Sequence, residues 1–63
     1  MIEDAVQVTW DGAMCKIRLD RIGKANSLTA SMLRALIEAF ASADRAARVI
    51  VLTGAGRVFS AGI

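Results

Sequence analysis

The chain has no histidine and no proline, and Cys15 is its single cysteine among 63 residues. One cysteine cannot close an internal disulfide, and without histidine or a second thiol the sequence predicts no metal site. Small domains usually need such a support or a partner, because about 60 residues bury only roughly 60% of the surface of the unfolded chain. A composition that is 56% hydrophobic therefore predicts a piece of a larger body.

A strong charge of either sign is also missing, since eight Lys and Arg against six Asp and Glu give a net charge of +2. The most basic stretch runs from Lys16 to Lys24 and is interrupted by Asp20. It is more typical of a solvated strand edge than of a phosphate site. No nucleic-acid-binding motif accompanies it, so no nucleic-acid partner is predicted.

The chain lacks a long hydrophobic run, and its longest strongly apolar segment, residues 49–52, is too short to cross a bilayer. The first four residues are not basic, and no apolar segment typical of a secretory signal follows them. Together with the free thiol of Cys15, these features predict a cytoplasmic protein without a membrane partner.

Alternating apolar and polar residues predict a strand from Asp4 to Trp10. Asp11 and Gly12 then predict a two-residue hairpin turn of type I′, in which both central residues need a positive φ. The resulting register puts apolar or small residues opposite each other on one face, and polar residues with Met14 on the other. The first set pairs Trp10 with Ala13, Val8 with Cys15 and Val6 with Ile17, and the second pairs Thr9 with Met14 and Gln7 with Lys16.

Residues 21–28 follow neither period and are predicted to form a loop. A helix is predicted from about Ala30 to about Ala43, with Thr29 as its N-cap, because apolar residues recur there at spacings of three and four. That apolar stripe consists of Met32, Leu33, Leu36, Ile37 and Phe40. The β-branched run of residues 49–52 predicts a parallel strand buried on both faces, so the fold class is α/β.

Side chains with catalytic potential are few. Gly54 and Gly56 do not complete a dinucleotide-binding fingerprint, because Phe59 stands where the third glycine is needed. Ser60 lacks both the flanking glycines of a nucleophile elbow and a histidine partner, so a structural or backbone role is favoured. Cys15 is expected to be a buried, inert thiol. The turn of residues 60–63 can instead aim backbone N–H groups into a crevice, where they stabilise an oxyanion.

Two segments, Lys24-Ala25-Asn26-Ser27-Leu28 and the run from Leu52-Thr53-Gly54 to Phe59-Ser60-Ala61-Gly62, closely resemble the N-terminal portion of the enoyl-CoA hydratase/isomerase, or crotonase, family. The resemblance spans nearly the whole chain and implies a crotonase-like fold of ββα units. Residues 1–63 would then be a truncated N-terminal part of one domain. The full-length enzyme is expected to be a homotrimer or hexamer.

The resemblance implies a hydratase (a lyase) or an isomerase that acts on acyl-CoA thioesters and stabilises an enolate with two backbone N–H groups. The resemblance assigns the first of these N–H groups to Ile63. It implies no cofactor besides the coenzyme A of the substrate. Lys24 is a candidate phosphate contact, and the backbone of Ser60 and Ala61 is expected beside the adenine. The full set expected to contact coenzyme A is Lys24, Ala25, Asn26, Ser60, Ala61 and Gly62.

The chain departs from the family at Ile22, where relatives usually carry a proline that stiffens the loop. The segment that gives the second N–H and the acid/base carboxylates are also missing, so the 63 residues alone are predicted to be inactive. The alternative belongs to another class of protein. It is a non-catalytic interaction module, or a decayed gene product, that binds a full-length relative through exposed apolar faces.

Overall fold

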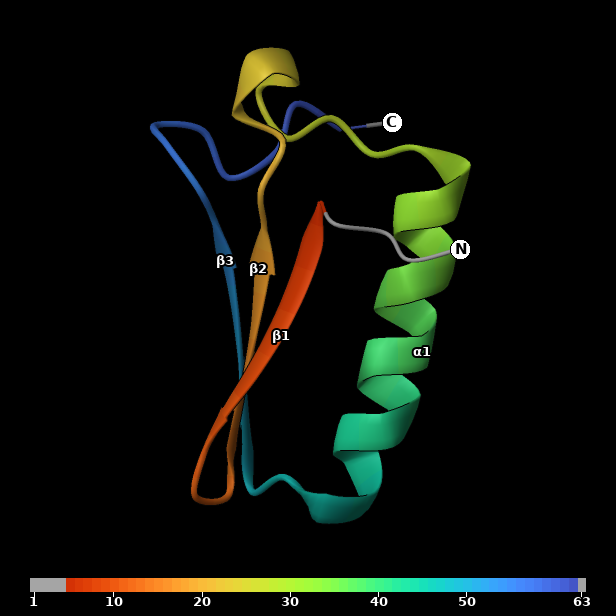
Figure 1. Cartoon of the computed structure of the whole chain (residues 1–63), viewed down its shortest axis with the longest axis vertical. Helices are drawn as coiled ribbons and strands as arrows, with labels where there is room; N and C mark the ends of the chain where they lie inside the picture. Colours follow the sequence, from red (N-terminus) through yellow and green to blue (C-terminus); the bar gives the residue numbers. More distant parts are fainter. Residues whose placement is uncertain (1–4, 63) are drawn as a thin grey trace.

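The computed structural model describes residues 5–62, which form one sheet with a helix packed on one of its faces (Figure 1). The elements are the strands β1 (Val6–Asp11) and β2 (Met14–Leu19), the 3₁₀ turn η1 (Ile22–Lys24), the helix α1 (Ala30–Ala46) and the strand β3 (Val49–Gly54). This order confirms the predicted α/β class, with a hairpin followed by a helix and a further strand.

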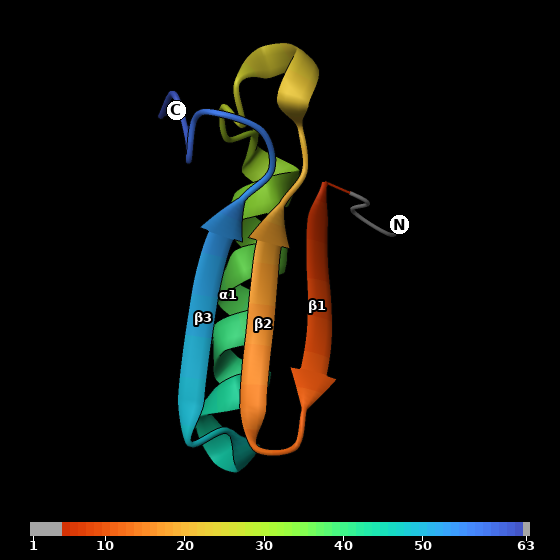
Figure 2. The ribbon, with the colours of Figure 1, turned by 90° about the vertical axis from the view of Figure 1, so that its left-hand side faces the viewer.

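The sheet has the strand order β1-β2-β3, with β1 antiparallel and β3 parallel to β2. A parallel pair needs a long crossover connection, and α1 supplies it. Figure 2 shows the three strands in front of α1, which lies behind β2 and β3. The parallel arrangement brings the carboxyl ends of β2 and β3 to the same edge of the sheet.

The predicted hairpin is present, but its predicted register is wrong by two residues. Trp10 lies opposite Cys15 and Val8 lies opposite Ile17, so Gly12 and Ala13 are the central residues of the turn. Only Gly12 takes a positive φ there, of 59°, which fits a turn with glycine at its first central position. A slip of two residues keeps each side chain on its face, so the predicted division into two faces still holds.

The core lies between the sheet and α1 and is built mainly by the central strand. Cys15, Ile17 and Leu19 of β2 are buried, whereas Lys16 and Arg18 between them are exposed. The helix contributes the fully buried residues Met32 and Ala43. The prediction that Cys15 is a buried thiol is therefore confirmed.

The helix begins where predicted, because the Thr29 side chain accepts a hydrogen bond from the Met32 backbone N–H at 3.2 Å. It ends at Ala46, three residues later than the predicted Ala43. Its apolar residues do not form a single buried stripe: Met32 is fully buried, whereas Ile37 is 67% exposed. Ile37 lies to one side of the buried line of the helix, which keeps spacings of four, three and four residues. That line consists of Met32, Leu36, Ala39 and Ala43.

The predicted final strand is confirmed as β3, but its burial is only partial. Ile50 and Val51 are half-buried, while Val49 is 50% and Leu52 is 38% exposed. Because β3 is an edge strand in this sheet, its β-branched run is more apolar than its surroundings here require.

Candidate functional site

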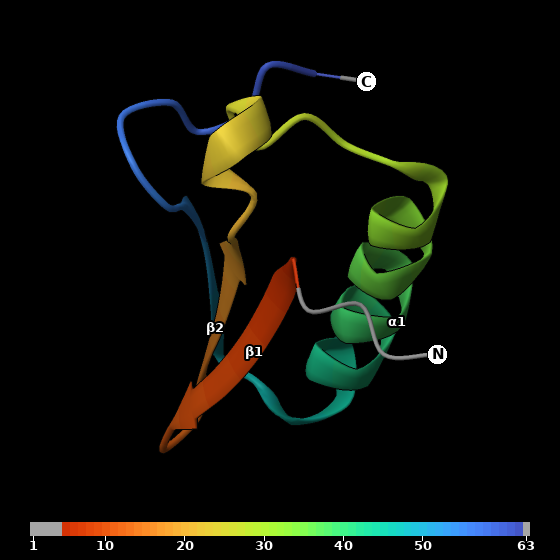
Figure 3. The same cartoon turned by 45° about the horizontal axis from the view of Figure 1, so that its top comes forward.

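Residues 24–28 and 55–62, which carry the motifs of the sequence, lie next to each other beyond the carboxyl ends of β2 and β3 (Figure 3). Each segment leaves its strand at this edge of the sheet, so the parallel pairing of the strands brings them together. In open α/β sheets this edge is where ligands usually bind. We therefore take this edge as the candidate site.

Asn26 holds the two segments together from the inside. It is completely buried, and its side-chain Nδ2 donates to the carbonyl oxygens of Ala55 and Val58, at 2.8 Å each. Its Oδ1 accepts the backbone N–H of Arg21 at 2.7 Å. The Asn26 side chain is thus fully engaged with the backbone and fixes both segments.

The backbone reverses at Ala25 and Asn26, whose φ values of 51° and 56° are both left-handed. Left-handed geometry is uncommon for residues other than glycine and is easier for asparagine than for alanine. The reversal lets the Ala25 carbonyl accept the N–H of Ala61 at 2.9 Å. It is followed by a second bond in the opposite sense, from the N–H of Leu28 to the carbonyl of Gly62, at 2.8 Å.

The Ser60 hydroxyl completes the contact between residues 24–28 and residues 55–62, which we call the junction. It donates to the Asn26 carbonyl at 2.8 Å and accepts the Gly62 N–H at 3.0 Å. Ser60 therefore uses its side chain to fix the backbone, in line with the structural role that the sequence favours. Gly62 itself has a φ of 93°, a conformation that favours glycine.

The sequence predicts a solvated edge for the basic stretch of residues 16–24, but the side chain of Arg21 within this stretch is engaged in the loop. Its Nη1 donates to the carbonyl oxygen and to the hydroxyl of Ser27, at 2.9 Å and 3.1 Å. The other members of the basic stretch, Lys16, Arg18 and Lys24, are exposed, as the sequence predicts. No periodic pattern distinguishes Arg21 from these residues, so sequence reasoning missed its role.

A shallow hollow of about 210 Å³ opens beside the junction. The exposed side chains of Ile22 and Arg57 contribute to its wall. The complete lining is Ile22, Ala25, Ala55, Gly56, Arg57 and Val58. Arg57 was not singled out from the sequence, where it stands as an isolated cation between a glycine and a valine.

The residues expected to contact coenzyme A are brought to this one edge, but they differ in accessibility. Lys24, Ala61 and Gly62 are exposed, and Ala25 and Ser60 are half-buried. Asn26 is fully buried. Ile63, the expected oxyanion-hole residue, lies outside the residues that the structure describes.

Across residues 5–62, no cluster of three or more His, Cys, Asp or Glu side chains has the arrangement of a metal site. In the same part of the chain, α1 falls short of the length and hydrophobicity needed to span a membrane.

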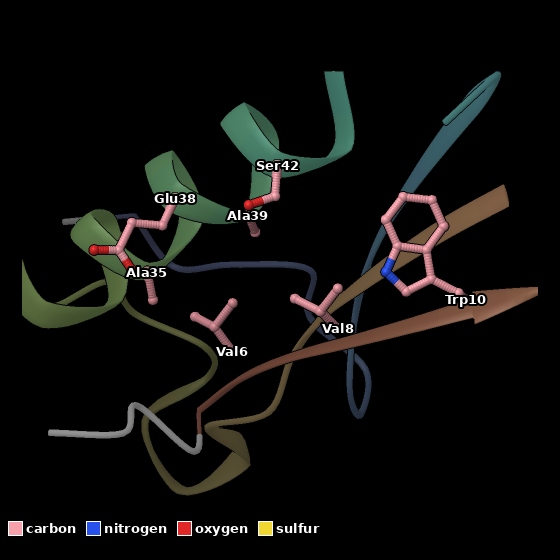
Figure 4. Close-up of a pocket in the computed structure, with 7 residues that line it drawn as sticks. All are labelled: Val6, Val8, Trp10, Ala35, Glu38, Ala39 and Ser42. Atoms are coloured by element: carbon pink, nitrogen blue, oxygen red, sulfur yellow. The ribbon is translucent and has the colours of Figure 1, made fainter. Parts of the chain in front are cut away.

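A second hollow, of about 310 Å³, lies between β1 and α1, away from the candidate site. Figure 4 shows Val6 and Val8 pointing from β1 into the space beneath the helix. Trp10, which is 46% exposed, forms one end of it. Residues from the helix that line it are Ala35, Glu38, Ala39 and Ser42. Apart from Glu38 and Ser42, this lining is apolar.

Comparison with known protein families gives a match to enoyl-CoA hydratase/isomerase over residues 9–63. A comparison with curated proteins gave no match. The family match begins within β1 and covers β2, the helix, β3 and both segments of the candidate site.

Solved structures show the same arrangement. The chain is 33% identical to an enoyl-CoA hydratase/isomerase from Mycobacterium paratuberculosis, with a TM-score of 0.87 over 94% of this chain and 24% of that one. It is 38% identical to an enoyl-CoA hydratase from Thermoplasma volcanium, with a TM-score of 0.82 over 95% and 25%. For an enoyl-CoA hydratase from Mycobacterium tuberculosis the values are 32%, 0.88, 95% and 28%. The chain thus has a crotonase-like fold and spans about a quarter of the length of these proteins.

Proposed function

The chain belongs to the enoyl-CoA hydratase/isomerase family, and we propose that it is the N-terminal part of an enzyme that acts on acyl-CoA thioesters. The observation that supports this most directly is the junction between residues 24–28 and 55–62. It lies beyond the carboxyl ends of two parallel strands and is held by hydrogen bonds from Asn26 and Ser60. Such a fixed backbone is what a site built from N–H groups requires.

The proposed chemistry is stabilisation of a thioester enolate by backbone N–H groups. Ile63 supplies the first N–H, directly after the turn of Gly62. The developing negative charge on the thioester oxygen is stabilised by hydrogen bonds that are already oriented, which lowers the barrier to proton removal or to water addition. A hydratase and an isomerase share this step, and they differ in the acid/base carboxylates that this chain does not supply.

Coenzyme A is proposed to lie along the exposed side of the junction. Lys24 is available for a phosphate contact because its side chain is exposed, and the backbone near Ala25, Ser60, Ala61 and Gly62 borders the same edge. Asn26, being completely buried, acts by positioning these neighbours. No cofactor besides the coenzyme A of the substrate is proposed.

Assembly and location are proposed from the family and from the single thiol. We expect the full-length protein to form a homotrimer or hexamer, with no nucleic-acid or membrane partner. A cytoplasmic location is consistent with the free, buried thiol of Cys15, because reducing compartments keep such thiols free.

The test is an activity assay on the full-length protein and on the 63-residue chain, with crotonyl-CoA as the substrate for hydration. The full-length protein is expected to hydrate it, and the 63-residue chain is expected to be inactive, because it lacks the second N–H donor and the carboxylates. Hydration by the 63-residue chain would refute the proposal that the second N–H donor and the acid/base carboxylates lie outside these 63 residues. A full-length protein that does not act on acyl-CoA thioesters would refute the proposed function.

The second hollow, between β1 and α1, favours a second candidate function. This candidate is a non-catalytic module that binds a full-length relative. Trp10, at one end of the hollow, is 46% exposed, and exposed apolar surface of this kind marks interaction sites. Size-exclusion chromatography of the 63-residue chain, alone and mixed with the full-length protein, separates the two functions. A defined folded complex supports the module, whereas aggregate or an unfolded monomer supports a part of an enzyme.

A further inference from the structure

We infer that Ser60 is a positioning residue for the oxyanion donor. Its hydroxyl fixes the backbone of Gly62, the residue directly before the N–H that the proposed function assigns to Ile63. The inference rests on that proposed function, and it assigns to the Ser60 side chain a task that a family match does not.

The hydroxyl has two partners, and their chemistry fixes its direction. The Asn26 carbonyl can only accept a hydrogen bond and the Gly62 N–H can only donate one. The Ser60 O–H therefore points to Asn26, at 2.8 Å, and a lone pair faces Gly62, at 3.0 Å. An alanine at position 60 would lose both bonds, whereas a threonine would keep the hydroxyl.

Asn26, which accepts the Ser60 O–H, is itself held firmly in place. Asn26 is completely buried, and its side chain donates to the carbonyls of Ala55 and Val58. The carbonyl that receives the Ser60 O–H thus belongs to a residue that is held on several sides. Through its two hydrogen bonds, Ser60 ties the exposed turn at Gly62 to this fixed residue.

The other side of Gly62 is held as well. Its carbonyl accepts the N–H of Leu28 at 2.8 Å, while its N–H is bound by Ser60. In a planar trans peptide the carbonyl and the following N–H point in opposite directions. Fixing the Gly62 carbonyl therefore orients the next N–H, and the two bonds together hold the φ of 93° at Gly62. Oriented donors are what make an oxyanion hole effective.

The experiment compares four variants in the full-length protein. Ser60→Ala and Ser60→Val remove the hydroxyl, and Ser60→Thr has the shape of the valine variant but keeps the hydroxyl. The matched control is Ser42→Ala, which removes an exposed hydroxyl from α1, far from the junction. The readouts are kcat and KM for crotonyl-CoA hydration and the infrared stretching frequency of the thioester carbonyl of bound butyryl-CoA.

We expect Ser60→Ala and Ser60→Val to lower kcat by about tenfold to a hundredfold, below the roughly 10²- to 10³-fold loss typical when a whole oxyanion donor is removed. KM changes little, because the hydroxyl faces the backbone and not the ligand. The carbonyl stretch of bound butyryl-CoA shifts toward its value in solution, since the oxyanion hole polarises it less. Ser60→Thr retains most of the rate, and Ser42→Ala matches the unchanged protein.

The two proposals fail in different ways. An inactive unchanged protein refutes the proposed function, and this inference falls with it. An active protein in which Ser60→Ala behaves like Ser42→Ala refutes only the inference. The same holds if Ser60→Thr is as slow as Ser60→Val, or if the loss is confined to KM. If Ser60→Ala does not fold, the comparison of the threonine and valine variants still decides.

Discussion

The backbone of Phe59 crosses directly over Gly54. A β-carbon at residue 54 would lie 2.8 Å from the Phe59 Cα and would overlap the Phe59 carbonyl oxygen. Gly54 ends β3 opposite Leu19 of β2, at the point where the chain turns back toward the junction with residues 24–28. The space that glycine leaves, and not a special φ, is what this position requires.

Gly54→Ala is expected to lower the free energy of unfolding by about 1–3 kcal/mol, because the atoms that must move belong to the backbone. Urea unfolding of the full-length protein, followed by circular dichroism, measures the change. Gly23→Ala is the matched control, since a β-carbon there meets nothing within 4 Å. Equal losses in the two variants would show that the contact with Phe59 is unimportant.

The regular part of the fold was predictable from local patterns, because burial on one face imposes a period on the sequence. Alternation gave the faces of the hairpin, and the Thr29 cap gave the start of α1. The predicted register of the hairpin is wrong because the prediction places Asp11 in the turn. In the structure Asp11 pairs with Met14, and the turn needs a positive φ only at Gly12. Alternation cannot detect this error, since a shift of two residues leaves every side chain on its face.

The candidate site was predictable only through the family resemblance, because loops have no period. Asn26 reaches Ala55 and Val58, which are 29 and 32 positions away, and no local pattern reports such contacts. The burial of Asn26 was likewise invisible, since a polar residue in a loop is usually exposed.

Asn26→Asp is expected to lower the free energy of unfolding by at least about 2 kcal/mol, since each buried group left without a partner costs about 1–3 kcal/mol. The carboxylate cannot donate to the Ala55 and Val58 carbonyls, and it would be buried against them. Urea unfolding again provides the measurement. The control Gln7→Glu makes the same chemical change at an exposed amide that donates to Asp20. Water screens the lost hydrogen bond and the new repulsion between the two carboxylates, so this change should cost no more than about 1 kcal/mol. A similar stability for both variants would contradict the role of Asn26 as a clamp.

Lys24→Gln tests the proposed phosphate contact in the full-length protein. Lys24 is exposed, and exposed ion pairs contribute about 0.2–1 kcal/mol, so KM for crotonyl-CoA should rise by no more than about fivefold while kcat is unchanged. The effect should shrink at high salt, because salt screens exposed charges. Lys16→Gln, an exposed lysine on β2, is the control. An identical KM in the two variants would remove Lys24 from the proposed site.

Thr29→Ala tests the start of the helix. The Thr29 hydroxyl accepts the Met32 N–H at 3.2 Å, and losing such a cap costs about 0.5–2 kcal/mol of stability. Thr29→Ser retains the hydroxyl and should unfold at nearly the same urea concentration as the unchanged chain. If the serine variant were as unstable as the alanine variant, the threonine methyl group and not the cap would be responsible.

Met32 and Ile37 belong to one apolar stripe in the sequence, yet the structure gives them different environments. Met32 is fully buried and Ile37 is 67% exposed. Met32→Ala should therefore lower the free energy of unfolding of the full-length protein by about 2–5 kcal/mol, because it leaves a cavity. If Ile37 keeps this exposure in the full-length protein, Ile37→Ala should change that free energy by no more than about 0.5 kcal/mol, as surface substitutions usually do.

The result for Ile37→Ala also shows what the outer side of α1 does in the full-length protein. If further chain packs on this side, Ile37→Ala becomes destabilising by about 2–5 kcal/mol, close to the loss for a core residue. If the loss stays near zero, Ile37 is exposed in the whole protein as well, and its apolar side chain is free for a partner. The loss for Ile37→Ala, compared with the loss for Met32→Ala, therefore decides whether Ile37 belongs to the core of the full-length protein or to its surface.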